Sequence, residues 1–406
     1  MAVGGNGGKS AVALVRCDTY DEAAVEKAVR EGLELIGGVS RFIKPGEKIV
    51  MKPNVLLGRK PGSCVCTHPA VFKAVGRVLL EAGAIVSGGD SSGFGTCAAN
   101  MGGSGLKQAA EDIGVTLADF DNGRVAARSE GLVCKRFVVA NGVLDADGVV
   151  SLPKLKTHGL TTYTGAIKNT FGCIPGLLKT QHHARYPDVN DFSAMLVDLN
   201  MLVRPRLFIM DGVMAMEGNG PNSGAPRHLG VILFSTDPVA LDAVACRIID
   251  LDPALVPTSG PGERAGLGTY HDGNITVLGG TVGEFVCKDF RVERKRRMFV
   301  QATGRGGGIR ETLKERAFSF IKKRFCQRPV IDKDTCTRCG LCVTSCPLTP
   351  KAVNWVRGDE SSPPAHDYNR CIRCFCCQEF CSAGAISVEE PRLVRVLSRL
   401  YGLVMR

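Results

Sequence analysis

The cysteines toward the C-terminal end constrain the fold more than any other feature of this chain. Half of the 18 cysteines lie between Cys336 and Cys381. Four of them follow the pattern C-x2-C-x2-C-x3-C, and a second run repeats the spacing with every member displaced by 35 positions. The first run is Cys336, Cys339, Cys342 and Cys346, and the second is Cys371, Cys374, Cys377 and Cys381. This internal duplication predicts a ferredoxin-like module that binds two [4Fe-4S] clusters.

The spacing also predicts which thiolates bind which cluster. Three thiolates separated by two residues can ligate three corners of one cubane, and the last cysteine of each run ligates the other cluster. The predicted ligands of the first cluster are Cys336, Cys339, Cys342 and Cys381, and those of the second are Cys371, Cys374, Cys377 and Cys346. Cys376 is left over, and Ser382 replaces the usual proline after the second run. A zinc ribbon would use two C-x2-C pairs without the further cysteines, so that site does not fit.

Composition limits the class of protein and its compartment. The chain has 406 residues, of which 44% are hydrophobic and 22% are charged, as in globular proteins of two or three domains. No run approaches the roughly 18 apolar residues that cross a bilayer. The N-terminal sequence MAVGGNGGKS has no apolar signal core. We therefore expect reduced thiols and a cytoplasmic location.

Residues 1–280 have the pattern of an α/β domain. Apolar runs that are typical of strands buried on both faces alternate with helical patterns. The predicted strands start near Ser10, Glu47, Ala84, Asp147, Arg206, Gly230 and Asn274. One helix follows Asp21, and another is predicted with Thr67 as its N-cap and Gly83 as its stop. The alternation predicts a mostly parallel sheet with helices on both faces.

Polar residues, among them Asp211, gather at the predicted strand ends, where open parallel sheets bind ligands. The predicted catalytic residues are His158, Lys156 and Asp90, with His158 as the proton donor. The predicted substrate-binding residues are Lys52, Asn54, Ser91, Lys154, Thr164, Lys168 and Asn169. Residues 152–172 are interpreted as a cationic, hydroxyl-rich loop suited to carboxylate or phosphate oxygens. The alternative is a solvated loop in which His158 is structural.

Short motifs in this region share their pattern with a known family. They are KPN at Lys52, THP at Thr67, GDSSG at Gly89, PKLKTH at Pro153, GAIKNTFG at Gly165 and DPVALDA at Asp237. With these motifs and the cysteine module, the chain resembles domain-of-unknown-function family 362, many members of which carry a C-terminal ferredoxin module. The resemblance implies an iron–sulfur protein and supplies no substrate.

Two basic segments flank the cysteine module. Residues 281–330 are predicted as a partly helical linker, and the stretch 291–328 holds 13 Lys or Arg against 3 Glu. This stretch is either a solvated linker or a surface that docks an acidic redox partner; we do not expect nucleic acid. Residues 331–390 are predicted as the two-cluster domain. Residues 391–406 are predicted as an amphipathic basic helix, which either caps that domain or contacts a membrane surface.

These observations favour a cytoplasmic iron–sulfur oxidoreductase, of the kind used in anaerobic metabolism. Its two-cluster module would relay electrons to or from an anionic small substrate or cofactor in the α/β domain. One alternative is a non-catalytic electron carrier or assembly factor that docks an acidic redox partner. Another is a non-redox enzyme whose clusters are structural or regulatory. The sequence leaves open the substrate, any organic cofactor and the oligomeric state.

Overall fold

The computed structural model describes residues 9–294 and 326–391, which form two compact units. The α/β unit contains the described residues up to Lys179 together with Ser193–Arg294. The cysteine-rich unit contains Thr180–Phe192 and residues 326–391. The predicted C-terminal helix, apart from its first residue, and most of the predicted basic linker lie outside the described residues.

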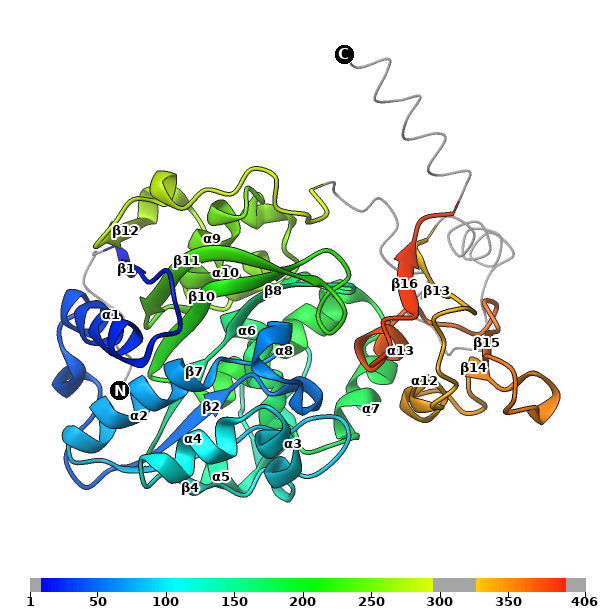
Figure 1. The fold of residues 1–406 in the computed structure, drawn as a ribbon, viewed down its shortest axis with the longest axis horizontal. Helices are drawn as coiled ribbons and strands as arrows, with labels where there is room; N and C mark the ends of the chain where they lie inside the picture. Colours follow the sequence, from blue (N-terminus) through cyan, green and yellow to red (C-terminus); the bar gives the residue numbers. More distant parts are fainter. Residues whose placement is uncertain (1–8, 295–325, 392–406) are drawn as a thin grey trace, which may run out of the picture. The chain divides into compact units, whose positions relative to one another are not determined.

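The α/β unit is built on a ten-stranded sheet in the order β12-β1-β11-β10-β7-β2-β3-β4, with β8 beside β10 and β9 beside β8 (Figure 1). Most neighbouring strands are parallel, as predicted; β11 runs antiparallel to β1 and β10, and β9 antiparallel to β8. The strands are β1 (Ser10–Arg16), β2 (Lys48–Pro53), β3 (Ile85–Gly88), β4 (Thr116–Leu117), β7 (Gly148–Leu152), β8 (Lys154–His158), β9 (Thr162–Thr164), β10 (Leu207–Glu217), β11 (Ala225–Ser235) and β12 (Ile275–Leu278). A separate hairpin is formed by β5 (Gly123–Ala127) and β6 (Arg136–Ala140).

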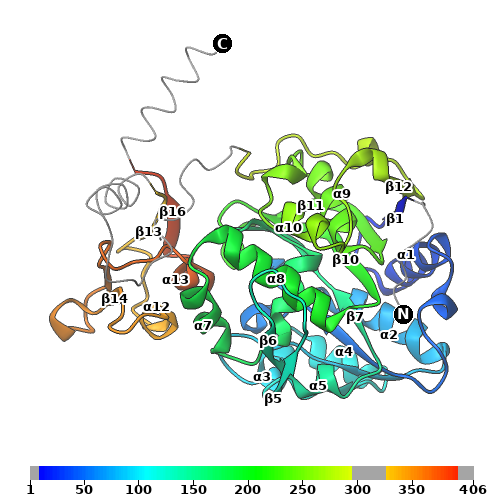
Figure 2. The ribbon, with the colours of Figure 1, turned by 180° about the vertical axis from the view of Figure 1, so that it is seen from behind.

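Helices cover both faces of the sheet, with α1, α2 and α4 on one face and α6 and α9 on the other (Figures 1 and 2). The helices are α1 (Glu22–Leu35), α2 (Pro69–Glu81), α3 (Cys97–Gly103), α4 (Leu106–Asp112), α5 (Asn141–Leu144), α6 (Ala166–Asn169), α7 (Leu178–Arg185), α8 (Val189–Val203), α9 (Pro238–Ile248) and α10 (Ser259–Arg264). None of the helices within residues 9–294 and 326–391 combines the length and apolar character that a membrane span requires.

The ends of α2 test two predictions. Gly83 follows the helix with a φ of 82°, a left-handed conformation that glycine adopts without strain, so the predicted stop is confirmed. The predicted N-cap is wrong by one residue. His68 caps the helix by accepting a hydrogen bond from the Ala70 amide, whereas the Thr67 hydroxyl donates to the Leu152 carbonyl at 2.6 Å. Thr67 is therefore used to tie the start of α2 to the end of β7.

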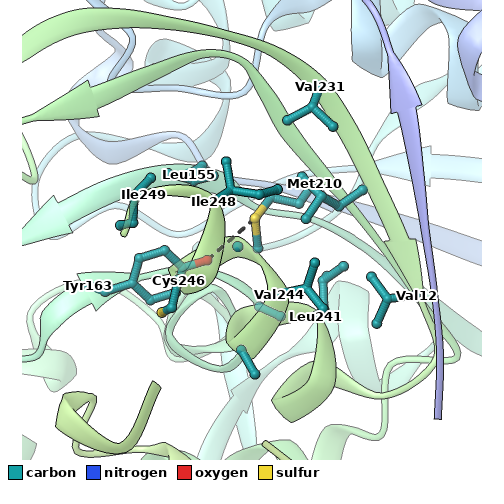
Figure 3. Close-up of a cluster of buried hydrophobic side chains, with 14 of the residues drawn as sticks. Val12, Leu155, Tyr163, Met210, Val231, Leu241, Val244, Cys246, Ile248 and Ile249 are labelled. Carbon is teal, nitrogen blue, oxygen red and sulfur yellow. Dashed lines mark hydrogen bonds between the residues drawn. The ribbon is translucent and has the colours of Figure 1, made fainter. Parts of the chain in front are cut away.

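A hydrophobic cluster fills the space between the sheet and α9 (Figure 3). Leu155 of β8 and Met210 of β10 meet Leu241 and Val244 of α9 in this cluster. The Tyr163 hydroxyl also lies in it, 3.4 Å from the Met210 sulfur. Burying a side chain of this kind contributes about 1.5–3 kcal/mol, so the cluster fixes β8 and β10 against the helix layer.

The cysteine-rich unit repeats its backbone as well as its sequence. Strand β13 (Arg328–Ile331) pairs with β16 (Ile386–Glu389), and β14 (Val353–Asn354) pairs with β15 (Ala365–His366). Short helices α12 (Leu341–Ser345) and α13 (Cys376–Glu379) each begin one residue before the third cysteine of a run and contain it. Arg338 and Arg373, which are 35 positions apart, both have a φ near 60° (59° and 61°). The duplication therefore extends to unusual backbone conformations.

Candidate functional site

The ends of β2 and β3, strand β8 and helix α6 bring five predicted site residues into one hydrogen-bonded group, the Lys52 network. The Lys52 Nζ lies 2.8 Å from Asp90 Oδ1 and donates to Asn169 Oδ1, also at 2.8 Å. The Lys156 Nζ donates to Asn54 Oδ1 at 2.8 Å. The Asn54 amide in turn donates to the same Asn169 oxygen at 3.3 Å. Residues that lie more than 100 positions apart are thus joined in one group.

The prediction of a cationic loop at residues 152–172 is wrong for its first part. Lys154, Lys156 and His158 lie in β8, and both lysines are at most 2% exposed. Alternation along the strand sends Leu155 into the hydrophobic cluster and the two lysines to the opposite face. The strand forms because it pairs with β10 and β9. Ammonium groups are buried here because oxygen atoms of the fold surround them.

A second buried ion pair lies beside the first lysine of β8. The Lys154 Nζ is 2.7 Å from Asp211 Oδ2 and donates to the Tyr20 hydroxyl at 2.8 Å. The Tyr20 hydroxyl donates to Asp211 Oδ1 at 2.7 Å, and the Tyr20 ring stacks on the His68 ring with centroids 3.6 Å apart. Burial raises the pKa of Tyr20 well above its ordinary value and lowers the pKa of His68 to about 4. Both rings are therefore neutral at neutral pH.

Sequence reasoning missed Tyr20 and misread Asp211. Tyr20 follows β1, so an inspection of the first strand end would have found it. Asp211 was expected just beyond the end of a strand, but β10 continues to Glu217 and Asp211 is fully buried within it. The strand is longer than expected because it pairs along most of its length with β11.

Two residues of the sequence motifs, Gly172 of GAIKNTFG and Asp242 of DPVALDA, support the Lys52 network without being part of its hydrogen bonds. Gly172 leaves space for the ion pair: a Cβ there would lie 1.9 Å from Asp90 Oδ1 and 2.6 Å from Lys52 Nζ. Asp242 holds the start of α6 by accepting hydrogen bonds from the amides of Ala166 and Ile167 at 2.6 and 3.1 Å. Burial raises the pKa of Asp242 to about 7. Helix α6 carries Asn169, so Asp242 positions that residue of the network.

The predicted proton donor is held by the backbone of its own turn. His158 Nδ1 accepts hydrogen bonds from the amides of Leu160 and Thr161 at 3.0 and 3.4 Å. When the imidazole is neutral, its hydrogen is therefore on Nε2. Thr164, a predicted substrate contact, lies on β9 opposite Lys156 in the antiparallel register.

The remaining predicted substrate contacts are Ser91 and Lys168. The Ser91 hydroxyl accepts hydrogen bonds from the Gly176 amide at 2.7 Å and from Lys179 Nζ at 3.2 Å. Lys168 is half-buried on α6, with its Nζ 4.7 Å from the centre of the Phe171 ring. The hydrogen bonds named here thus join Ser91 to residues outside the Lys52 network.

Thiols near the lysines are buried and protonated. Burial raises the pKa of Cys66 to about 11 and that of Cys173 to about 12. Cys64 also has a raised pKa, for the same reason. A nucleophilic cysteine requires a lowered pKa, so these thiols behave as packing groups. The structure describes all 18 cysteines, and none of them forms a disulfide.

A cavity in the cysteine-rich unit gathers four thiols from both runs. Its lining includes Cys336, Cys339, Cys342 and Cys381, which are the predicted ligands of the first cluster. Ile331, Ile386 and Pro364 supply apolar walls. The cavity therefore fits a cluster chemically, because its donors are thiols and its walls are apolar.

The other predicted ligands also lie close to one another. Burial raises the pKa of Cys377 well above its ordinary value, and the neighbouring thiols of Cys374, Cys371 and Cys346 raise it further. Hydrogen bonds reach two of these sulfurs: the Ala352 amide donates to Cys346 Sγ at 3.3 Å, and His366 Nε2 lies 3.4 Å from Cys377 Sγ. This donor set fits a second cluster.

Comparison with known proteins agrees with both units. Residues 49–247 match the family model of the domain of unknown function DUF362, and residues 328–382 match a 4Fe-4S dicluster domain. A thylakoid-associated protein of Synechocystis sp. is 39% identical over 257 residues, which cover 63% of this chain and 79% of that protein.

Two solved structures are similar to part of this chain. The lactate racemase apoprotein from Thermoanaerobacterium thermosaccharolyticum is 11% identical, with a TM-score of 0.40 over 59% of this chain and 56% of that one. A structural-genomics protein from Thermotoga maritima is 12% identical, with a TM-score of 0.31 over 55% of this chain and 57% of that one. These similarities concern the fold alone.

Proposed function

Because this chain belongs to the DUF362 family and carries a 4Fe-4S dicluster domain, we propose that it is an iron–sulfur oxidoreductase that acts on an anionic small substrate or cofactor. The observation that carries the proposal is the buried Lys52 network at the strand ends. Electrons pass through the cysteine-rich unit, and the α/β unit binds the molecule that accepts or supplies them.

The eight cysteines of the two runs hold the clusters in this proposal. Cys336, Cys339, Cys342 and Cys381 surround one site, and Cys371, Cys374, Cys377 and Cys346 surround the other. When bound, the clusters supply one-electron transfer. The protein's own part is to enclose the sulfurs in apolar walls and to donate hydrogen bonds to them.

The energetic cost of the Lys52 network supports a functional role. Lys52 and Lys156 are both 1% exposed, and removing an ammonium from water costs several kcal/mol before its new partners offset the loss. Apolar residues of similar size would often be as stable as such a group, or more so. A group of buried, titratable residues at the strand ends of a parallel sheet is therefore a candidate ligand site.

The network can exchange its internal partners for a ligand. Lys156 donates to Asn54 Oδ1 and to the Val65 carbonyl at 2.7 Å, and both acceptors are neutral. A carboxylate or phosphate oxygen that replaces the amide oxygen forms a charge-assisted bond, which is about twice as strong as a neutral one. His158 Nε2 carries the hydrogen of the neutral ring and serves as the proton donor. Lys154 and Lys168 contribute positive potential around the ligand.

A titration of the anaerobically prepared full chain tests the proposal. The absorbance of the clusters is followed while small carboxylates and phosphate esters are added to the oxidised and the dithionite-reduced protein. We expect at least one compound to oxidise or reduce the clusters, and Lys156→Met to weaken that response at least tenfold. Lys107→Met is the matched control, since Lys107 lies on the surface, 3.9 Å from Glu111. A chain that responds to none of the compounds, or equally with and without Lys156, contradicts the proposal.

The compartment and the protein partner are part of the same proposal. The 18 cysteines, all within the described residues, form no disulfide, which supports a reducing compartment such as the cytoplasm. An acidic redox partner would be attracted by residues 291–328, most of which lie outside the described residues. A chain that acts only as an electron carrier would pass electrons to that partner at the same rate after Lys156→Met.

A further inference from the structure

The two halves of the cysteine-rich unit differ at one position beside a predicted cluster ligand. His366 of β15 lies with its Nε2 3.4 Å from Cys377 Sγ. The residue 35 positions earlier is Ile331, at the corresponding end of β13. Ile331 lines the cavity of the first predicted cluster, so both residues occupy the same place beside a ligand set. One half therefore presents a nitrogen to its sulfur, and the other half presents a hydrocarbon.

The strand pairing confirms that the two positions are equivalent. Ile331 lies opposite Ile386 in the antiparallel pair of β13 and β16. His366 lies opposite Val353 in the pair of β14 and β15. The backbone carbonyl of Asp332, next to Ile331, accepts a hydrogen bond from the Cys336 amide at 3.1 Å. The backbone carbonyl of Asp367, next to His366, accepts one from the Cys371 amide at 3.0 Å. The difference at this position is thus in the side chain and not in the fold.

A hydrogen bond to a cluster sulfur changes the reduction potential. A ligating thiolate accepts hydrogen bonds and donates none, so His366 Nε2 must carry the hydrogen when Cys377 binds iron. Reduction adds negative charge to the cluster and its sulfurs, so the N–H group stabilises the reduced form more than the oxidised one. The potential of that cluster is raised as a result.

A difference in charged residues between the two halves acts on the reduction potential in the same direction as the His366 hydrogen bond. Arg373 is 4% exposed and donates to the Cys371 carbonyl at 3.1 Å, whereas its counterpart Arg338 is exposed. A buried positive charge also favours the reduced form. Burial of a cluster opposes both effects, because an apolar environment disfavours added charge. The contribution of His366 can be separated from burial by changing that side chain alone.

We propose that His366 is a positioning residue that makes the cluster on Cys371, Cys374, Cys377 and Cys346 the one with the higher reduction potential. When both clusters are bound, an electron that enters the module would move from the first cluster to the second, which would oxidise the first and reduce the second without making or breaking a bond. The inference rests on the ligand sets of the proposed function but not on its substrate. It assigns the second cluster as the site where the electron resides.

Redox titration of the full chain, monitored by electron paramagnetic resonance, tests this proposal. The wild type is compared with His366→Ile, which copies the first half, and with His366→Gln, which keeps a side-chain N–H. The reciprocal variant Ile331→His places an imidazole beside the first ligand set. Iron is counted in each preparation, and dithionite is the reductant.

We expect two potentials in the wild type, and in His366→Ile a fall of the higher one. The expected fall changes the distribution of one electron between the clusters about tenfold, which corresponds to about 59 mV for a one-electron couple. His366→Gln is expected to retain more of the wild-type potential than His366→Ile. Ile331→His is expected to raise the lower potential.

The outcomes that overturn the proposal are distinct from failure of the proposed function. Equal potentials in the wild type, or unchanged potentials in His366→Ile with full iron content, overturn it. If His366→Ile loses its second cluster, Ile331→His decides: a raised lower potential supports the proposal and an unchanged one overturns it. A wild-type chain that binds no iron contradicts the proposed function itself, whereas a chain with normal clusters and no substrate response leaves this inference standing.

Discussion

The cysteine-rich unit and the α/β unit assemble their sites from the chain in opposite ways. In the first, each run of four cysteines spans 11 residues and recurs after 35 positions. In the second, Lys52 meets Asn169 across 117 positions, and Tyr20 meets Asp211 across 191. Three thiols of the first run line one cavity because their local spacing brings them together, whereas the lysines find their partners only when the sheet is complete.

The comparison shows where each unit is sensitive to mutation. A cluster site depends on individual sulfur ligands, so we expect one substitution to remove one metal centre. The Lys52 network depends on many packed neighbours. One substitution there leaves a buried charge without its partner and lowers the free energy of unfolding. The four predictions below separate these two kinds of dependence, beginning with the largest expected effect.

Removal of a single sulfur is expected to abolish one cluster. In Cys377→Ala, iron should fall from about eight to about four atoms per chain, because each cubane needs four thiolates. Iron analysis and electron paramagnetic resonance of the anaerobically prepared full chain measure this. Cys376→Ala is the matched control at the neighbouring buried position, and it should keep all of its iron. Equal losses in the two variants would show that Cys376 is a ligand.

A side-chain atom added beside the Lys52–Asp90 ion pair should destabilise the α/β unit without loss of iron. In Gly172→Ala the added Cβ meets Asp90 and Lys52, so the buried pair must separate, at a cost of about 3–5 kcal/mol in the free energy of unfolding. Urea unfolding followed by circular dichroism measures the change. Gly102→Ala, whose Cβ has no neighbour within 4 Å, should alter stability by less than about 1 kcal/mol. A stable Gly172→Ala variant would mean that the pair can rearrange.

The second ion pair distinguishes the cost of a broken pair from the value of an intact one. Lys154→Met leaves Asp211 buried without its ammonium partner, and we expect a loss of about 3–5 kcal/mol. Lys154→Met with Asp211→Leu removes both charges and should lose clearly less. The free energies of unfolding of the two variants are compared. If the double variant is the less stable one, the attraction within the pair exceeds its desolvation cost.

A smaller effect is expected from pH through Asp242. Its pKa is raised to about 7 in the folded protein, so between about pH 4 and pH 7 the folded state binds more protons than the unfolded state. The free energy of unfolding should therefore fall as the pH rises through this window. In Asp242→Asn this slope should be reduced, whereas Asp145→Asn, at an exposed ion pair with Arg124, should keep it. Identical slopes in the wild type and Asp242→Asn would contradict the assignment.

Much of the α/β fold could be predicted because strand and helix patterns are local. The parallel core of the sheet and the stop at Gly83 agree with the sequence. The strand predicted from Asp147 extends to Lys156, whereas the structure divides this stretch into β7 and β8, and Lys154, Leu155 and Lys156 alternate as a strand does. Alternating lysines usually indicate a solvated face, and nothing in the local sequence shows that Asp211 and Asn54 will cover them.

The sequence by itself determined the cysteine pattern, its duplication and the polar character of the strand ends, because all three are properties of neighbouring residues. Only the tertiary structure decided that Lys52, Lys154 and Lys156 are buried and paired. It also placed His366, and not its counterpart Ile331, as a hydrogen-bonding group beside a cysteine sulfur. The physical reason is that a charge or an N–H group acts through the atoms around it, and those atoms come from distant parts of the chain.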